Sequence, residues 1–148
     1  MKFHQFHPGQ VIEAGTRTLT QDEVLAFATA YDPQWFHTDL DAAAKGPFGG
    51  LIASGWHTCS IAMRMVVDTV LHDSECFASP GFSRLRWPNP VRPGEALTLR
   101  ITVDVVRRST KRPDVGVVEW TWRMSNAQGQ LVLEASATNL FDLKRAST

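Results

Sequence analysis

An aspartate and a histidine lie five residues apart in the segment Asp32-Pro-Gln-Trp-Phe-His37. A histidine side chain has an ordinary pKa of about 6.5, so it takes up and releases a proton near neutral pH, and a carboxylate can orient a water molecule or the imidazole ring. Together these residue types form a proton-transfer pair. A purely structural interpretation also stands, in which Asp32 forms a turn before Pro33 and His37 is a half-buried loop residue.

A glycine-rich segment, residues 46–57, follows this pair and leads into an apolar stretch. If a helix begins there, the free N–H groups around Gly55 and Trp56 can bind a carbonyl oxygen that gains negative charge. Alternatively, the glycines only let the chain pass close to a sheet. The segment has neither the GxGxxG nor the GxxxxGK[ST] pattern, so a nucleotide-phosphate site is not indicated.

Three helices are expected around these residues. Thr20 and Glu23 form a capping box for a helix that runs to about Tyr31 and stops before Pro33. Asp39 begins a second, short helix that ends at Gly46-Pro47. The two helices leave residues 32–38 as a connecting loop, and a loop can aim both Asp32 and His37 at one point.

The third helix, from about residue 54 to residue 71, is apolar over most of its circumference and must be largely buried. One narrow polar stripe interrupts it, made of His57, Ser60, Arg64 and Asp68. After Pro80-Gly81 the chain changes from helical to strand patterns. Apolar and polar residues alternate over 97–105, 118–124 and 131–138, with turn residues between, and residues 11–19 form a plausible first strand. The sequence predicts an α+β fold, in which a curved antiparallel sheet wraps around one long helix.

Composition limits the class of protein further. The 148 residues have the size of one domain (1–148), and fifteen basic and fifteen acidic side chains cancel, which disfavours a nucleic-acid binder. The two cysteines are too few for a disulfide framework or a thiolate metal site, and histidines near the N-terminus or beside Asp39 are weak metal candidates, so no metal is expected. With no secretion signal and no membrane span, we expect a cytoplasmic protein.

The motif Asp32-x-x-x-x-His37, followed by Phe48-Gly-Gly-Leu-Ile-Ala-Ser-Gly55 and a long apolar helix, resembles the MaoC-like dehydratases, which include the (R)-specific enoyl-CoA hydratases. The likeness covers most of the chain, from the helix that begins at Thr20 to the strands after the Pro93-Gly94 turn. It implies a hotdog fold and a homodimer, or a higher homo-oligomer, whose sheets join edge to edge. It also implies a tunnel for an acyl thioester near the interface.

The resemblance assigns the catalytic roles to Asp32 and His37, and it assigns polarisation of the thioester carbonyl to the backbone N–H of Gly55. The implied reaction is reversible addition of water to a trans-2-enoyl thioester of coenzyme A or of an acyl carrier. No cofactor is implied, since coenzyme A serves only as the handle of the substrate. The expected substrate contacts are Trp35, Phe48, Gly50, Ser54, Trp56 and His57.

The chain departs from the hydratase pattern at Gln34-Trp35, where the family commonly has Asn-Pro, and at Met63, where some hydratases carry a small hydroxyl residue. These departures concern which substrate the pocket accepts rather than the class of reaction. One rival is a hotdog thioesterase, which would need a carboxylate on the central helix, where only Asp68 is available. Another is a non-catalytic subunit that binds acyl-CoA.

Three arginines near the proline-rich turn, Arg84, Arg86 and Arg92, carry two open interpretations. They can meet the phosphates of coenzyme A, or they can solvate the edge of a strand.

Overall fold

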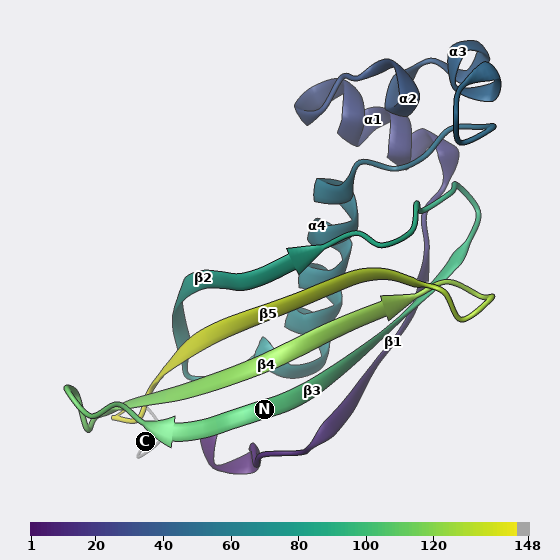
Figure 1. The fold of residues 1–148 in the computed structure, drawn as a ribbon. Helices are drawn as coiled ribbons and strands as arrows, with labels where there is room; N and C mark the ends of the chain where they lie inside the picture. The colour runs from purple at the N-terminus through teal and green to yellow at the C-terminus, as the bar shows by residue number, and fades with distance from the viewer. Residues whose placement is uncertain (145–148) are drawn as a thin grey trace.

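The computed structural model describes residues 1–144 and contains one antiparallel sheet of five strands (Figure 1). The strands follow the order β1-β3-β4-β5-β2, so β1 and β2 form its two edges. Their bounds are β1 Val11–Thr18, β2 Cys76–Arg86, β3 Ala96–Arg108, β4 Val115–Ser125 and β5 Leu131–Asp142. The predicted antiparallel pairing is confirmed for every neighbouring pair.

Four α-helices accompany the sheet: α1 Gln21–Tyr31, α2 Trp35–Thr38, α3 Leu40–Lys45 and α4 Gly55–Val66. A π-helical turn, Val67–Leu71, extends α4, and a 3₁₀ turn, Phe3–Gln5, precedes β1. The long helix runs along one face of the sheet, while α1, α2 and α3 gather near the end from which α4 begins (Figure 1). Within residues 1–144, every helix is too short or too polar to cross a bilayer.

The expected helix boundaries are confirmed by their caps. Thr20 accepts a hydrogen bond from the backbone N–H of Glu23, and the Glu23 carboxylate accepts one from the N–H of Thr20. Asp39 accepts from the N–H of Ala42 at the start of α3, and Ser54 caps α4. Residues 46–54 connect α3 to α4. Because both helices are fixed by their caps, these residues follow a defined path into α4.

Two elements differ from the sequence expectation. Residues 35–38 form the single turn α2 rather than a loop, and residues 76–86 form strand β2, which the sequence patterns did not predict. Most of β2 is exposed on both faces, so it has no apolar alternation for a pattern to detect. Pro80 and Gly81 lie inside it, and such residues normally argue against a strand except at an edge.

The core lies between α4 and the inner face of the sheet. Ala62, Val66 and Trp120 are fully buried there, together with the inward residues of β3 and β5. One side of α4 is not covered, since Trp56 remains 58% and Met63 37% exposed. The predicted polar stripe also needs correction, because His57 is buried while Ser60 and Arg64 are exposed. The sheet therefore covers α4 on one side only.

Replacement of Thr20 by alanine should lower the free energy of unfolding by about 1 kcal/mol, because it removes the side-chain acceptor from the N-terminus of α1. Chemical denaturation measures this change. Thr110→Ala, at an exposed turn, is the control and should stay within about 0.5 kcal/mol of the parent protein. Equal effects of the two substitutions would contradict the capping role.

Candidate active site

Asp32 and His37 are brought together by a tight local path. Asp32 is the C-cap of α1, where its N–H donates to the carbonyl of Ala28, and His37 lies in the single turn of α2. The N–H of Gln34 donates to the Asp32 carbonyl and the N–H of His37 to that of Gln34, which folds the chain back on itself. The carboxylate oxygen Oδ2 of Asp32 lies 3.4 Å from Nε2 of His37.

The ring of His37 is buried and held in one orientation. Its Nδ1 lies 2.7 Å from the backbone carbonyl of Ile52. A carbonyl oxygen can only accept a hydrogen bond, so Nδ1 carries a proton. In the neutral ring, Nε2 is then the unprotonated nitrogen, and it faces Asp32 as a hydrogen-bond acceptor.

Both carboxylate oxygens of Asp32 accept hydrogen bonds. The hydroxyl of Ser54 donates to Oδ2 at 2.7 Å, and the amide of Gln34 donates to Oδ1 at 2.7 Å. These bonds, that of Ser54 first, hold the pKa of Asp32 below its ordinary value, with a smaller contribution from the nearby imidazole. Asp32 is therefore an ionised acceptor at neutral pH.

When the ring is neutral, two acceptors, the Asp32 carboxylate and the imidazole Nε2, face each other 3.4 Å apart. A water molecule has two O–H donors and can satisfy both at once. A water held in this way has its oxygen lone pairs directed away from the pair, ready to attack an electrophile, and a base beside it to receive its proton.

Gly55, the first residue of α4, supplies a donor for an oxyanion. Ser54 caps the helix by accepting from the N–H of Trp56 at 3.3 Å, and no acceptor within residues 1–144 takes the N–H of Gly55. The indole of Trp87 lies over Gly55 so closely that an added Cβ would come within 2.6 Å of a ring carbon. Only glycine fits beneath this ring without displacing it.

A cavity of about 220 Å³ is lined by His37 and Gly55 but not by Asp32. Phe48 and Trp87 line it as well. The other lining residues are Ile52, Ala53, Thr58, Pro88, Asn89, Pro90, Val91 and Val132. The wall is mostly apolar with a few polar groups, which is the usual character of a small-molecule site.

The expected substrate contacts separate into two groups. Phe48 lines the cavity, and Ser54 contacts Asp32 directly. Gly50 lies beside Arg92, whose guanidinium donates to the carbonyl of Phe48 at 2.6 Å. These residues lie at or next to the site.

The other predicted contacts are not among the cavity-lining residues. Trp35 packs against Gly46 and is 47% exposed, while Trp56 meets the edge of Trp87 on the outside. His57 is buried in a parallel stack on Phe27, 4.5 Å between ring centres, and burial lowers the pKa of this histidine. Its Nδ1 has no hydrogen-bond partner within the described chain.

Sequence reasoning missed the roles of Gln34 and of the segment Trp87–Pro90. Gln34 appeared only as a departure from the family pattern, whereas its amide holds Asp32. The segment has no periodic signal, and only its two prolines mark it as irregular. Across residues 1–144, no group of three or more His, Cys, Asp or Glu side chains is arranged to hold a metal ion.

The antiparallel sheet around a long helix is the hotdog fold, and an Asp/His pair beside a helix whose first N–H is free is the kind of site a hydratase or dehydratase needs. The chain belongs to the family of the MaoC like domain, whose model matches residues 3–121. That membership supports a hydratase or dehydratase activity.

Individual proteins agree with the family. The crystal structure of a MaoC-like dehydratase from Rhodospirillum rubrum superimposes with a TM-score of 0.86 at 34% identity, over 94% of each chain. An (R)-hydratase from A. caviae shares the fold, with a TM-score of 0.73 at 21% identity over 91% of this chain and 96% of that one. The 3-hydroxyacyl-thioester dehydratase Z of Mycobacterium tuberculosis is 38% identical over 79 residues, which span 52% of each protein.

The role of Ser54 in setting the charge of Asp32 can be tested directly. Ser54→Ala removes the hydrogen bond that contributes most to the lowered pKa, so an NMR titration of the Asp32 carboxyl should show its pKa rising towards the ordinary value of 3.8. Because the folded-state pKa is the lower one, Asp32 stabilises the fold above about pH 3.8, and this contribution disappears as the pH falls through the folded value. The variant should show a smaller acid-dependent loss of stability.

Ser60→Ala is the matched control, since the hydroxyl of Ser60 donates to the carbonyl of Trp56 on the same helix and does not contact Asp32. An unchanged Asp32 pKa in the Ser54 variant would overturn the assignment.

Proposed function

We propose that this protein is a hydratase or dehydratase that adds water reversibly to a trans-2-enoyl thioester. One observation carries the proposal: His37 and Gly55 line one cavity, and the carboxylate of Asp32 lies 3.4 Å from the His37 ring. The pair can orient water, and the amide can stabilise the negative charge that develops on the thioester oxygen. These are the two functions that addition to a conjugated carbonyl requires.

In the addition direction, a water molecule donates its hydrogens to Asp32 Oδ2 and His37 Nε2. Its oxygen forms a bond to C3 of the enoyl group as the pair takes one proton. The electrons of the C2–C3 double bond move towards the carbonyl, and the resulting enolate oxygen accepts from the N–H of Gly55. The pair then delivers a proton to C2, which completes the 3-hydroxyacyl thioester with all atoms accounted for.

The expected contributions are those of well-characterised enzymes. Proton transfer by a positioned group contributes about 10²–10⁴-fold, and one oxyanion donor about 10²–10³-fold. Every group in these steps belongs to the protein, so we propose no metal or redox cofactor for them. Coenzyme A, or an acyl carrier, acts as the handle of the substrate.

The thioesterase alternative lacks its carboxylate. Asp68, the acid of the central helix, lies in the π-helical turn beyond α4, more than three turns from Gly55, and its side chain is 53% exposed and paired with Arg64 at 2.8 Å. A charge so placed reaches solvent rather than the cavity. The non-catalytic alternative differs from our proposal only in turnover, which the following experiment measures.

Asp32→Asn and His37→Ala should each lower kcat/KM for hydration of trans-2-butenoyl-CoA by at least about 10²-fold, because the first removes the carboxylate charge and the second the imidazole that handle the proton of the water. The measurement is loss of enoyl absorbance, with circular dichroism to verify folding. Asp41→Asn and His7→Ala, changes of the same type at exposed positions, are the controls and should keep full activity.

Three results would contradict the proposal. Release of free thiol without loss of the enoyl group would indicate a thioesterase. Tight binding of acyl-CoA with no turnover by the parent protein would indicate a binding subunit. Full activity of both site variants would show that the pair does not carry the reaction.

We also propose that a second copy of the chain covers β2 and the adjoining side of α4. Exposed aromatic side chains gather on these elements, with Phe77 48% and Phe82 49% exposed on β2 and Trp56 58% exposed on α4. Trp87, directly after β2, contacts Trp56 edge-on, so the exposed apolar surface is continuous at that point. An apolar surface of this kind commonly marks a protein interface.

Phe82→Lys should shift the protein towards the monomer in sedimentation velocity, because a lysine in an apolar interface must be desolvated without a partner. Val11→Lys, on the opposite edge strand, is the control, since Val11 is equally exposed at 54% and should leave the oligomeric state unchanged. A parent protein that sediments as a monomer at micromolar concentration would refute this interface.

A further inference from the structure

Two aromatic rings join the helix that ends before Asp32 to the helix that begins at Gly55. His57 of α4 stacks face to face on Phe27 of α1, with 4.5 Å between the ring centres and 3° between the ring planes. His57 lies two residues after Gly55 in the chain. Phe27 lies five residues before Asp32. The stack therefore connects the proposed oxyanion donor with the carboxylate of the site.

The C-terminal half of α1 has few other attachments to the core. Of residues 27–31, Ala28 is buried and Phe27 is half-buried, while the other three are exposed. An alanine side chain offers little contact area, so the stack is the main side-chain contact that docks this half of the helix. Phe27 also packs against Tyr31, at 5.1 Å between ring centres, and Tyr31 directly precedes Asp32.

The stack complements the hydrogen bond from Ser54 to Asp32. That bond, at 2.7 Å, fixes one carboxylate oxygen but lets the end of α1 pivot about it. The N–H of His57 donates to the carbonyl of Ser54 at 3.0 Å, so the His57 ring and the Ser54 hydroxyl belong to one helical turn. Two contacts from the same turn hold α1 at two points. Together they fix the carboxylate relative to Gly55.

We propose that His57 is a positioning residue, whose stack on Phe27 holds the carboxylate of Asp32 in its working position relative to the N–H of Gly55. This inference rests on the proposed function and names a further residue on which its rate depends. His57 is not among the residues that line the cavity, so we expect its effect on the reaction step rather than on substrate binding. A misplacement of about 1 Å can cost about 10²-fold in rate.

The stack is also sensitive to acid, because the His57 ring lacks a polar partner. The residue is 6% exposed, and its Nδ1 has no hydrogen-bond partner in the described part of the chain. In the neutral ring Nδ1 can be an unused acceptor, whereas in the protonated ring both nitrogens are donors. Protonation would therefore bury an N–H without an acceptor, which is costly. The neutral ring is the form that suits the stack.

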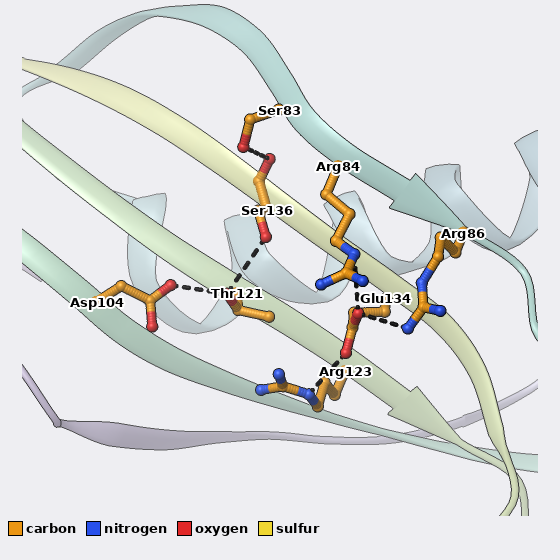
Figure 2. Close-up of polar contacts among 8 residues, drawn as sticks. All are labelled: Ser83, Arg84, Arg86, Asp104, Thr121, Arg123, Glu134 and Ser136. Atoms are coloured by element: carbon orange, nitrogen blue, oxygen red, sulfur yellow. Dashed lines mark hydrogen bonds and ion pairs between the residues drawn. The ribbon is translucent and has the colours of Figure 1, made fainter.

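The charged groups that face His57 come from α1 and β1. Glu23 raises the pKa of His57 and Arg17 lowers it, but the two pair with each other at 3.0 Å, and burial is the largest cause of the lowered pKa. A larger charged cluster lies on the outer face of the sheet, in front of the strands in Figure 2, whereas α4 lies behind them. Its members, which thus face away from His57 and the cavity, are Arg84, Arg86, Arg123 and Glu134.

The test compares kcat and KM for hydration of trans-2-butenoyl-CoA in variants of the stack. His57→Ala should lower kcat at least about tenfold and change KM less than about threefold, since it disturbs alignment without removing a substrate contact. Phe27→Ala should do the same, and the double variant should be no slower than the slower single variant, because both remove one contact. His57→Phe keeps a flat ring and should retain kcat within about threefold of the parent value.

Met65→Ala is the matched control, because Met65 is also buried in α4 but lies about two turns beyond His57, among core residues. It should lower the melting temperature, as His57→Ala does, and leave kcat within about twofold. If His57→Ala does not fold, Phe27→Leu takes its place, since it keeps an apolar side chain but no ring. That variant should show the same loss in kcat alone, of at least about threefold.

Two further readouts do not depend on turnover. In an NMR titration, the pKa of the Asp32 carboxyl should rise towards 3.8 in His57→Ala and stay unchanged in Met65→Ala. The folded-state pKa of His57 is lower than its ordinary value of 6.5, so the stack contributes fully above about pH 6.5 and weakens as the pH falls towards the folded value. Between about pH 7 and about pH 5, the melting temperature should therefore fall more for the parent protein than for His57→Phe.

Unchanged kcat in His57→Ala, or equal kcat in His57→Ala and Met65→Ala, would overturn the proposal while leaving the hydratase function intact. A loss in His57→Phe as large as that in His57→Ala would also overturn it, because the flat ring would then not be what matters. Absence of turnover by the parent protein would instead overturn the proposed function, and the Asp32 titration would then decide on His57 alone. The same Asp32 pKa in the parent protein and in His57→Ala would refute the positioning role.

Discussion

The hydroxyl group of Ser54 is the contact on which the geometry of the site depends. It donates to Asp32 Oδ2 at 2.7 Å and accepts from the N–H of Trp56 at 3.3 Å. The same atom therefore fixes the carboxylate and caps the helix whose first N–H, that of Gly55, is the proposed oxyanion donor. Asp32 and Gly55 are kept at a constant separation because one fully buried residue connects them.

The sheet makes that contact rigid. α4 is held by fully buried residues such as Ala62 and Val66 against the inner face, where Trp120 donates its indole N–H to Asn139 at 3.1 Å. Close packing of this kind resists small displacements, so the start of the helix cannot drift relative to the cavity wall. In the proposed function the long helix thus contributes through the position of its N-terminus, while its own side chains mostly serve the core.

Much of this arrangement could be predicted from the residues, and the reasons are local. The capping box at Thr20, the cap at Asp39 and the alternation in β3, β4 and β5 each encode an element in neighbouring residues. The Asp32/His37 pair was identifiable for the same reason, since both residues belong to one short segment. The resemblance to MaoC-like dehydratases added the assignment of Gly55.

The remaining features depend on contacts between distant segments. β2 shows no alternation because its faces are exposed, and its partner β5 lies about 50 residues later in the chain. Trp87 meets Gly55 although the two residues belong to segments that lie far apart in the chain. His57 was expected at the site from its position in the first turn of α4, but the stack with Phe27 of α1 buries it. No spacing within one segment encodes such tertiary neighbours.

The short path between Asp32 and His37 has a consequence for how the enzyme fails. Their separation is maintained by backbone hydrogen bonds within residues 28–37, whereas Gly55 depends on the docking of a whole helix. Opening costs least in short exposed segments and most in elements packed into the core. Partial loosening would therefore separate the acid–imidazole pair while α4 stays docked, so the proposed activity would be lost before most of the secondary structure.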